Sequence, residues 1–216
     1  MIVACVRTGN KYPSEYVHRL RLMVEKYLTN DYEFICLTDH PREVNCNTLD
    51  ISEFYLNGWW GKMALFEPTW RKGERVIYFD LDTVICGDLS PLFNLFVDFG
   101  LCANFTRASG NKSWPCHYGS CVMTIGPNRC EDVWHNFNAN DVRLMRSAGN
   151  YGDQKVIEEL SPGATLLQDV LPKGFFLGYR DLTNYKPKGC SVVVFAGSSK
   201  PHNCEKEWIR EAWELS

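Results

Sequence analysis

The chain has 216 residues, of which 45% are hydrophobic and 13% aromatic, which is enough apolar material for the core of one globular domain. Its 23 Lys and Arg residues against 26 Asp and Glu residues give a formal net charge of -3, so charge offers no general support for nucleic-acid binding. The ten cysteines are scattered from Cys5 to Cys204 without a CxxC pair. Reduced, buried thiols are therefore expected rather than a disulfide framework.

The amino-terminal residues show no export signal. Residues 1–6 are apolar but too few for a signal peptide, and no basic segment precedes them. No stretch approaches the roughly 18 apolar residues of a membrane span. The sequence therefore predicts a cytoplasmic protein without a transmembrane segment, formed by a single domain over residues 1–216.

The predicted elements begin with a strand, a helix and a strand. Residues 2–6 form an apolar run, residues 14–28 carry apolar side chains at helical spacing, and residues 34–37 form a second apolar run. Such a β-α-β crossover implies parallel strands, and open α/β sheets bind ligands at the carboxyl ends of their strands.

The rest of the chain predicts further elements of both kinds. Residues 59–66 indicate the start of a helix, and residues 75–79 are a strongly β-prone run. Further strands are expected at residues 101–106, 121–125 and 191–196, and further helices at residues 129–136 and 153–160. The fold class predicted from this order is α/β.

Two carboxylates, Asp80 and Asp82, follow the run at residues 75–79. Residues i and i+2 of an extended chain point the same way, so both carboxylates can converge on one hard cation such as Mg²⁺ or Mn²⁺. A strand cap in solvent is the structural alternative for so short a motif. The buried character of the strand favours a bound partner, because buried carboxylates need compensation.

Residues 79–84, FDLDTV, also superficially fit the opening motif of haloacid-dehalogenase-like phosphatases. In that family the motif lies near the start of the domain and is followed late by a Gly-Asp motif with a further metal-binding Asp. Here Gly152 and Asp153 lead into Gln154 and Lys155 instead. The phosphatase is therefore the weaker alternative.

A longer segment resembles a different family. Residues 58–93, GWWGKMALFEPTWRKGERVIYFDLDTVICGDLSPLF, closely resemble the centre of GT-A-type glycosyltransferases, in particular the family-8-like group that includes glycogenin and bacterial galactosyltransferases. In that group a lysine-bearing helix, a strand, the DxD metal motif and a Gly-Asp-Leu-x-x-Leu-Phe segment follow in this order. The resemblance continues at Tyr12, at residues 152–154 and 178–180, and at residues 195–201. It implies one Rossmann-like GT-A domain, with a mixed, mainly parallel sheet flanked by helices.

The resemblance implies a metal-dependent hexosyl- or pentosyltransferase. Such an enzyme moves a sugar from a nucleotide diphospho-sugar, expected to be a UDP-sugar, to an acceptor hydroxyl with retention of anomeric configuration. The implied cofactor is Mn²⁺ or Mg²⁺, and the expected acceptor is a glycan, a lipid-linked sugar or a small molecule. A modified nucleic acid is open as an acceptor but has no support from charge. A non-catalytic nucleotide-sugar-binding module is the other alternative.

The resemblance also implies roles for individual residues along the cleft. The residues that match its donor-binding positions are Val6, Arg7, Thr8, Tyr12, Asp39, Lys62, Asp80, Arg180 and Lys200. Among these, Tyr12 is expected to stack on the base, and Lys62 and Lys200 to contact the phosphates. Asp82 is the implied principal metal ligand, assisted by Asp80. Asp153 and Gln154 are the implied catalytic pair beside the anomeric carbon, where they would position the acceptor hydroxyl and stabilise an oxocarbenium-like transition state.

Three features at other positions leave alternatives open. Residues 193–197, VVFAG, lack the late metal-binding histidine of many members, and His202 is either a substitute third ligand or an ordinary surface histidine. The spacing of Cys116, His117, Cys121 and Cys130 fits no standard zinc pattern. Residues 111–118, with Trp114 and Tyr118, are interpreted as an acceptor-side loop, with packing in the core as the alternative.

Overall fold

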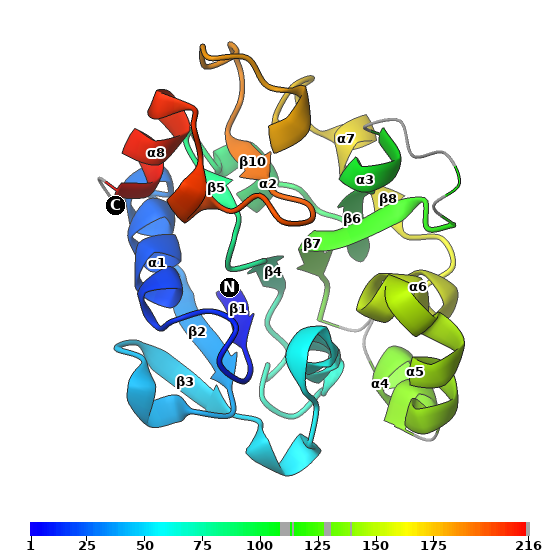
Figure 1. Cartoon of the computed structure of the whole chain (residues 1–216). Helices are drawn as coiled ribbons and strands as arrows, with labels where there is room; N and C mark the ends of the chain where they lie inside the picture. Colours follow the sequence, from blue (N-terminus) through cyan, green and yellow to red (C-terminus); the bar gives the residue numbers. More distant parts are fainter. Residues whose placement is uncertain (109–112, 114, 128–130, 139, 215–216) are drawn as a thin grey trace.

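The computed structural model describes residues 1–108, 113, 115–127, 131–138 and 140–214 (Figure 1). Within these residues a seven-stranded sheet has the order β3-β2-β1-β4-β7-β6-β8. Its strands are β1 (Ile2–Arg7), β2 (Glu33–Thr38), β3 (Asn47–Asp50), β4 (Val76–Phe79), β6 (Phe99–Ala103), β7 (Tyr118–Ile125) and β8 (Thr165–Leu166). Strands β3, β2, β1 and β4 are parallel, and β7 runs antiparallel to both β4 and β6. The predicted mixed, mainly parallel sheet is confirmed.

The first strand explains why the sheet is covered on both faces. All six residues of β1 are buried. Val3 and Cys5 belong to the apolar core on one face, and Ile2, Ala4 and Val6 belong to the core on the other. Successive side chains of a strand point to opposite faces, so a continuous apolar run produces two buried faces.

Helices and 3₁₀ turns cover these two faces. On one face α1 (Glu15–Tyr27) lies beside α8 (Glu207–Glu214), and Leu20 and Trp213 join the same core (Figure 1). On the other face lie η3 (Gly58–Phe66), α4 (Glu131–Asn138), α5 (Asp141–Ala148) and α6 (Gly152–Leu160). The remaining short elements are α2 (Ser90–Phe93), α3 (Phe105–Ala108), α7 (Leu167–Val170), η1 (Pro41–Glu43), η2 (Ser52–Phe54), η4 (Gly149–Tyr151), η5 (Tyr179–Asp181) and η6 (Pro201–Asn203).

A second, three-stranded sheet joins distant parts of the chain. Its order is β5-β10-β9, with β5 (Val84–Ile85), β10 (Val192–Val194) and β9 (Phe176–Gly178). Strand β5 follows Asp82 by two residues and pairs antiparallel with β10. This pairing brings the segment that follows β10, including Lys200, back to the acidic pair.

Two predicted elements differ from the structure. Residues 58–66 form the 3₁₀ helix η3 rather than an α-helix, because Gly58 and Gly61 disfavour the α-helical conformation. A Cβ built on Gly61 would lie 2.7 Å from Cγ2 of Thr8, so this glycine allows η3 to approach β1 closely. The strand expected at residues 101–106 ends at Ala103, because the Asn104 side chain accepts a hydrogen bond from the Thr106 amide at 3.0 Å and turns the chain into α3.

Other predictions agree with the described part of the chain. The helix expected at residues 129–136 is α4, and Arg129 lies outside the described residues. The nine cysteines described carry free thiols, and all but Cys46 and Cys121 are buried. No helix among the described residues has the length and apolar character needed to cross a membrane.

Leu20→Ala should lower the free energy of unfolding by about 2–5 kcal/mol, because it leaves a cavity beneath the centre of α1, where Leu20 is fully buried. Urea denaturation followed by circular dichroism measures the change. Glu25→Ala, on the exposed side of the same helix, is the matched control and should change the stability by less than about 0.5 kcal/mol. Equal effects of the two variants would contradict the packing described for α1.

Candidate active site

A cavity of about 690 Å³ opens where β1 and β4 end. Its walls come from the β1–α1 loop, η3, the segment after β4, the start of α3, the start of β7, the start of α6 and the segment after β10. Nine of the residues expected at the site line it, namely Val6, Thr8, Tyr12, Lys62, Asp80, Asp82, Asp153, Gln154 and Lys200. The fold therefore gathers at one place residues that are up to 194 positions apart in the chain, Val6 and Lys200 being the extremes.

The Lys62 ammonium group connects two carboxylates of this cavity. Its Nζ lies 2.8 Å from Oδ1 of Asp80 and 3.2 Å from Oδ2 of Asp153. It also donates a hydrogen bond to Oγ of Ser120 at 3.2 Å, and that hydroxyl in turn donates to Oδ2 of Asp153 at 2.5 Å. Asp153 and Ser120 are buried, so the lysine supplies the positive charge that these carboxylates need away from water.

The ionisation of these groups follows from burial and from their charged neighbours. Burial lowers the pKa of Lys62, but the carboxylates of Asp153 and Asp80 outweigh it, so that this pKa is raised. Burial raises the pKa of Asp80 to about 6, against the opposing effect of Lys62 and with a further contribution from the charge of Asp82. The Tyr78 hydroxyl donates a hydrogen bond to Oδ1 of Asp80 at 2.5 Å. Burial, with the nearby charge of Asp80, raises the pKa of Tyr78, so this phenol stays a hydrogen-bond donor.

Asp82 is held by a second set of contacts. Its Oδ2 atom accepts a hydrogen bond from the Tyr12 hydroxyl at 2.8 Å and lies 2.6 Å from Nζ of Lys200. The same ammonium group stands 5.7 Å from the centre of the Tyr12 ring. Burial and the charge of Asp82 raise the pKa of Tyr12. Each carboxylate of the acidic pair therefore has its own lysine and its own tyrosine.

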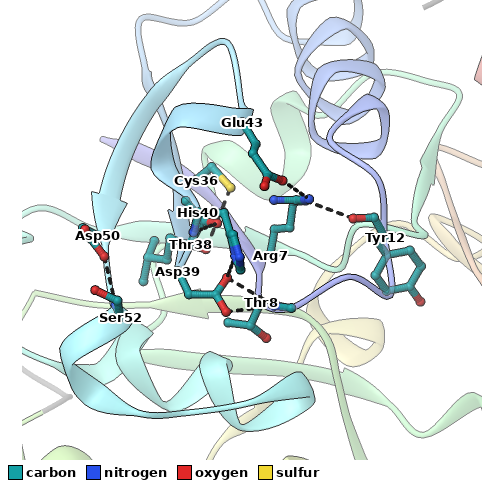
Figure 2. A network of polar contacts seen from close by, with 12 residues as sticks. Arg7, Thr8, Tyr12, Cys36, Thr38, Asp39, His40, Glu43, Asp50 and Ser52 are labelled. Carbon is teal, nitrogen blue, oxygen red and sulfur yellow. Dashed lines mark hydrogen bonds and ion pairs between the residues drawn. The ribbon is translucent and has the colours of Figure 1, made fainter.

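Arg7 does not line the cavity but contacts Tyr12 in the β1–α1 loop (Figure 2). Its Nε donates to the Tyr12 carbonyl oxygen at 2.9 Å, and its Nη2 pairs with Glu43 at 2.7 Å. Val6 and Thr8 line the cavity, and Arg7 between them points to the other side, as alternation along an extended chain requires. Its role in donor binding stays a prediction, and the structure shows it fixing the position of Tyr12.

Asp39 is also not among the lining residues, and it belongs to the same polar network as Arg7 and Thr8 that Figure 2 draws. Its carboxylate accepts hydrogen bonds from the Gly9 amide, the shorter at 2.9 Å, and lies 2.7 Å from Nδ1 of His40. Burial raises its pKa, but the Gly9 amide and His40 outweigh that effect, so the pKa is lowered. Asp39 thereby connects the end of β2 to the loop that carries Tyr12.

Arg180 and His202 do not line the cavity, although Arg180 contacts Ala196 and Gly197, which do. Nη2 of Arg180 donates to the Ala196 carbonyl oxygen at 3.4 Å. The guanidinium group packs against Gly197, whose φ is 80° and on which a Cβ would lie 2.8 Å from Nη2. The His202 ring contacts the Tyr16 hydroxyl through Nδ1. The roles expected of Arg180 and His202 stay predictions.

The described residues contain no group of three or more His, Cys, Asp or Glu side chains placed to hold a metal ion. Asp80 and Asp82 line one cavity that His202 does not line, and Cys116, His117 and Cys121 form no such group. Cys130 and Trp114 lie outside the described residues. Tyr118 packs against the core, and its hydroxyl donates to the Ala164 carbonyl oxygen at 3.1 Å.

The chemistry of the acidic pair fits a hard divalent cation. Mg²⁺ and Mn²⁺ bind through one or two carboxylates and complete their coordination with water and substrate phosphates, so a third protein ligand is not required. The charged residues that line the cavity balance, with Lys11, Lys62 and Lys200 against Asp80, Asp82 and Asp153. Protein charges alone therefore do not offset an additional diphosphate.

Two contributors to the site were not among the sequence predictions. Tyr78 precedes Asp80 by two positions, so the period of the strand already places both side chains on one side. Ser120 comes from β7, which is antiparallel to β4, and no local sequence signal connects it with Lys62 or Asp153.

Comparison with solved structures finds this fold in glycosyltransferases. The galactosyltransferase LgtC, solved with donor and acceptor sugar analogues, is similar with a TM-score of 0.69 and 15% identity over 100% of this chain and 95% of that chain. The bifunctional glycosyltransferase WbbM gives a TM-score of 0.66 and 15% identity over 99% of this chain and 49% of that chain. GlyE of Streptococcus pneumoniae gives 0.64 and 14% identity over 99% and 62%. No protein-family model and no curated protein sequence matches the chain. The GT-A-type fold expected from the sequence is confirmed by these structures.

Lys62→Met should lower the free energy of unfolding by about 3–5 kcal/mol, because it leaves the carboxylates of Asp80 and Asp153 without their shared positive charge. Urea denaturation in the presence of a metal chelator measures this effect. The double variant Lys62→Met/Asp153→Asn should lose less than the sum of the two single losses, by about 1–3 kcal/mol, because the two side chains interact directly. Additive losses would contradict the coupling.

Proposed function

We propose that the chain is a metal-dependent glycosyltransferase that moves a sugar from a nucleotide diphospho-sugar, a UDP-sugar in the first instance, to an acceptor hydroxyl with retention of configuration. The observation that carries the proposal is the Lys62 contact with both Asp80 and Asp153. It places a carboxylate suited to a divalent cation directly beside a buried carboxylate suited to sugar chemistry, within one cavity. The shared fold with glycosyltransferases supports the proposal.

The donor would lie along the ends of β1 and β4. Val6 and Thr8 offer a wall for the base, and the Tyr12 ring offers a flat face in the same cavity. Mn²⁺ or Mg²⁺ held by Asp80 and Asp82 would neutralise charge on the departing nucleoside diphosphate, a Lewis-acid effect. Lys200 pairs with Asp82 in this structure and becomes available to a donor phosphate once Asp82 has another counter-charge.

The transfer itself would take place beside Asp153 and Gln154. Positive charge develops at the anomeric carbon as the glycosidic bond breaks, and a fixed carboxylate stabilises it without reorganising. The Ser120 hydroxyl and the Lys62 ammonium hold Asp153 in one orientation. Gln154 faces the same cavity, and its Oε1 accepts a hydrogen bond from Asn104 at 3.4 Å. This pair would orient the acceptor hydroxyl.

The proposed enzyme is a single cytoplasmic domain whose acceptor is a glycan, a lipid-linked sugar or a small molecule. A module that binds nucleotide sugars without turnover would use the same cavity. The similarity of the fold to glycosyltransferases does not favour the phosphatase alternative. Turnover therefore has to be measured directly.

Purified protein with Mn²⁺ and a panel of nucleotide sugars should release nucleoside diphosphate. Asp82→Asn should lower kcat/KM by at least about 100-fold, which corresponds to ~2.7 kcal/mol of lost transition-state stabilisation. A coupled assay for the released nucleoside diphosphate measures the rate. Asp31→Asn, an exposed aspartate outside the cavity, is the control and should match the wild type.

Each alternative gives a different result in the same assay. Full activity of Asp82→Asn would contradict the assignment of the metal site. Nucleotide-sugar binding without release would establish the non-catalytic module, and hydrolysis of a generic phosphomonoester would establish the phosphatase.

A further inference from the structure

Trp59 is an exposed aromatic residue on the wall of the cavity. Its side chain is 49% exposed, and it lines the same cavity as Asp153 and Gln154. A single exposed aromatic elsewhere on a protein surface needs no explanation. An indole beside convergent polar groups in a cavity is, in contrast, the composition of a ligand-binding wall.

A glycine fixes the position of this indole. Gly152 has a φ of 61°, and a Cβ built on it would lie 2.9 Å from Nε1 and 3.0 Å from Cε2 of Trp59. The ring therefore packs directly on the backbone at the start of α6, one residue before Asp153. A side chain at position 152 would displace it. The start of α6 therefore positions both the Trp59 ring and the proposed catalytic pair.

Amide groups accompany the aromatic surface. Asn57 and Gln154 both line the cavity, and the Asn57 side chain does not cap η3. Side-chain amides donate and accept hydrogen bonds, as sugar hydroxyls do. A pyranose ring presents C–H groups on its faces and hydroxyls around its rim, so an indole face with amides beside it matches such a ring in both respects.

A chain of contacts connects Trp59 to the acidic pair through Asp153 and Lys62. Lys200 contacts Asp82, Lys62 connects Asp80 to Asp153, and Gly152, next to Asp153, contacts Trp59. Lys200 and the acidic pair suit a diphosphate and its metal ion, whereas Trp59 contacts the residue next to Asp153, where the acceptor hydroxyl is proposed to bind.

We propose that Trp59 is the stacking platform of the acceptor subsite and that the acceptor is a glycoside whose pyranose ring packs on its indole face. The inference rests on the proposed glycosyltransferase function and adds the chemical class of the acceptor to it. Gly152 and the amides of Asn57 and Gln154 complete the subsite. An acceptor hydroxyl of the stacked sugar then faces Asp153.

The test uses Trp59→Ala and Trp59→Phe with simple methyl pyranosides as acceptors. Trp59→Ala should raise the KM for the pyranoside about tenfold, equivalent to ~1.4 kcal/mol of lost stacking, with a smaller change in the KM for the donor. Trp59→Phe keeps a flat ring and should recover most of the loss. Tyr185→Ala removes an aromatic side chain that is 83% exposed and outside the cavity, and serves as the control.

Binding measured without turnover keeps this test separate from that of the proposed function. Saturation-transfer NMR of the methyl pyranosides should show contact with the wild type and its loss in Trp59→Ala. Absence of nucleoside diphosphate release from every donor would overturn the proposed transferase, and the NMR result would still decide on the sugar site. A pyranoside that binds Trp59→Ala and the wild type equally, or a larger rise in the KM for the donor, would overturn the subsite.

Discussion

The site depends on one largely buried ammonium group, that of Lys62, which lies between two carboxylates. Lys62 comes from η3, Asp80 from the end of β4, and Asp153 from the start of α6, which is far from the other two elements in the sequence. Burying an unpaired carboxylate costs several kcal/mol, so a conformation in which Lys62 moves away from the two carboxylates is destabilised by a similar amount. Gly61 is part of the same constraint, because only a residue without Cβ lets η3 approach Thr8 and Val6 closely enough.

The second sheet positions the lysine that pairs with Asp82. Pairing of β5 with β10 brings Lys200 to Asp82, which also accepts a hydrogen bond from the Tyr12 hydroxyl. Both lysines occupy positions next to carboxylates that suit a divalent cation. The cavity is consequently balanced in charge by the protein alone, and an incoming diphosphate must bring compensating charge with it.

The sequence predicted the elements with strong local patterns. β1, α1, β2 and β4 are continuous apolar runs or clear helical periods, and the run predicted as a strand at residues 191–196 contains β10. The sequence missed β5 and β9, which contain only two and three residues and depend on pairing with a distant segment. The same contrast holds at the site. The acidic pair and Lys62 followed from motifs, but Ser120 is defined only by the fold. Arg7 lies outside the cavity because it alternates with Val6 and Thr8 along an extended segment.

We propose that this charge-balanced cavity binds a nucleoside diphosphate together with a divalent cation. Isothermal titration calorimetry of UDP into the wild-type protein, with Mn²⁺ and then with a metal chelator, measures this dependence. UDP should bind at least about tenfold more tightly with Mn²⁺, a difference of ~1.4 kcal/mol or more. Equal affinity under the two conditions, or no binding in either, would contradict it.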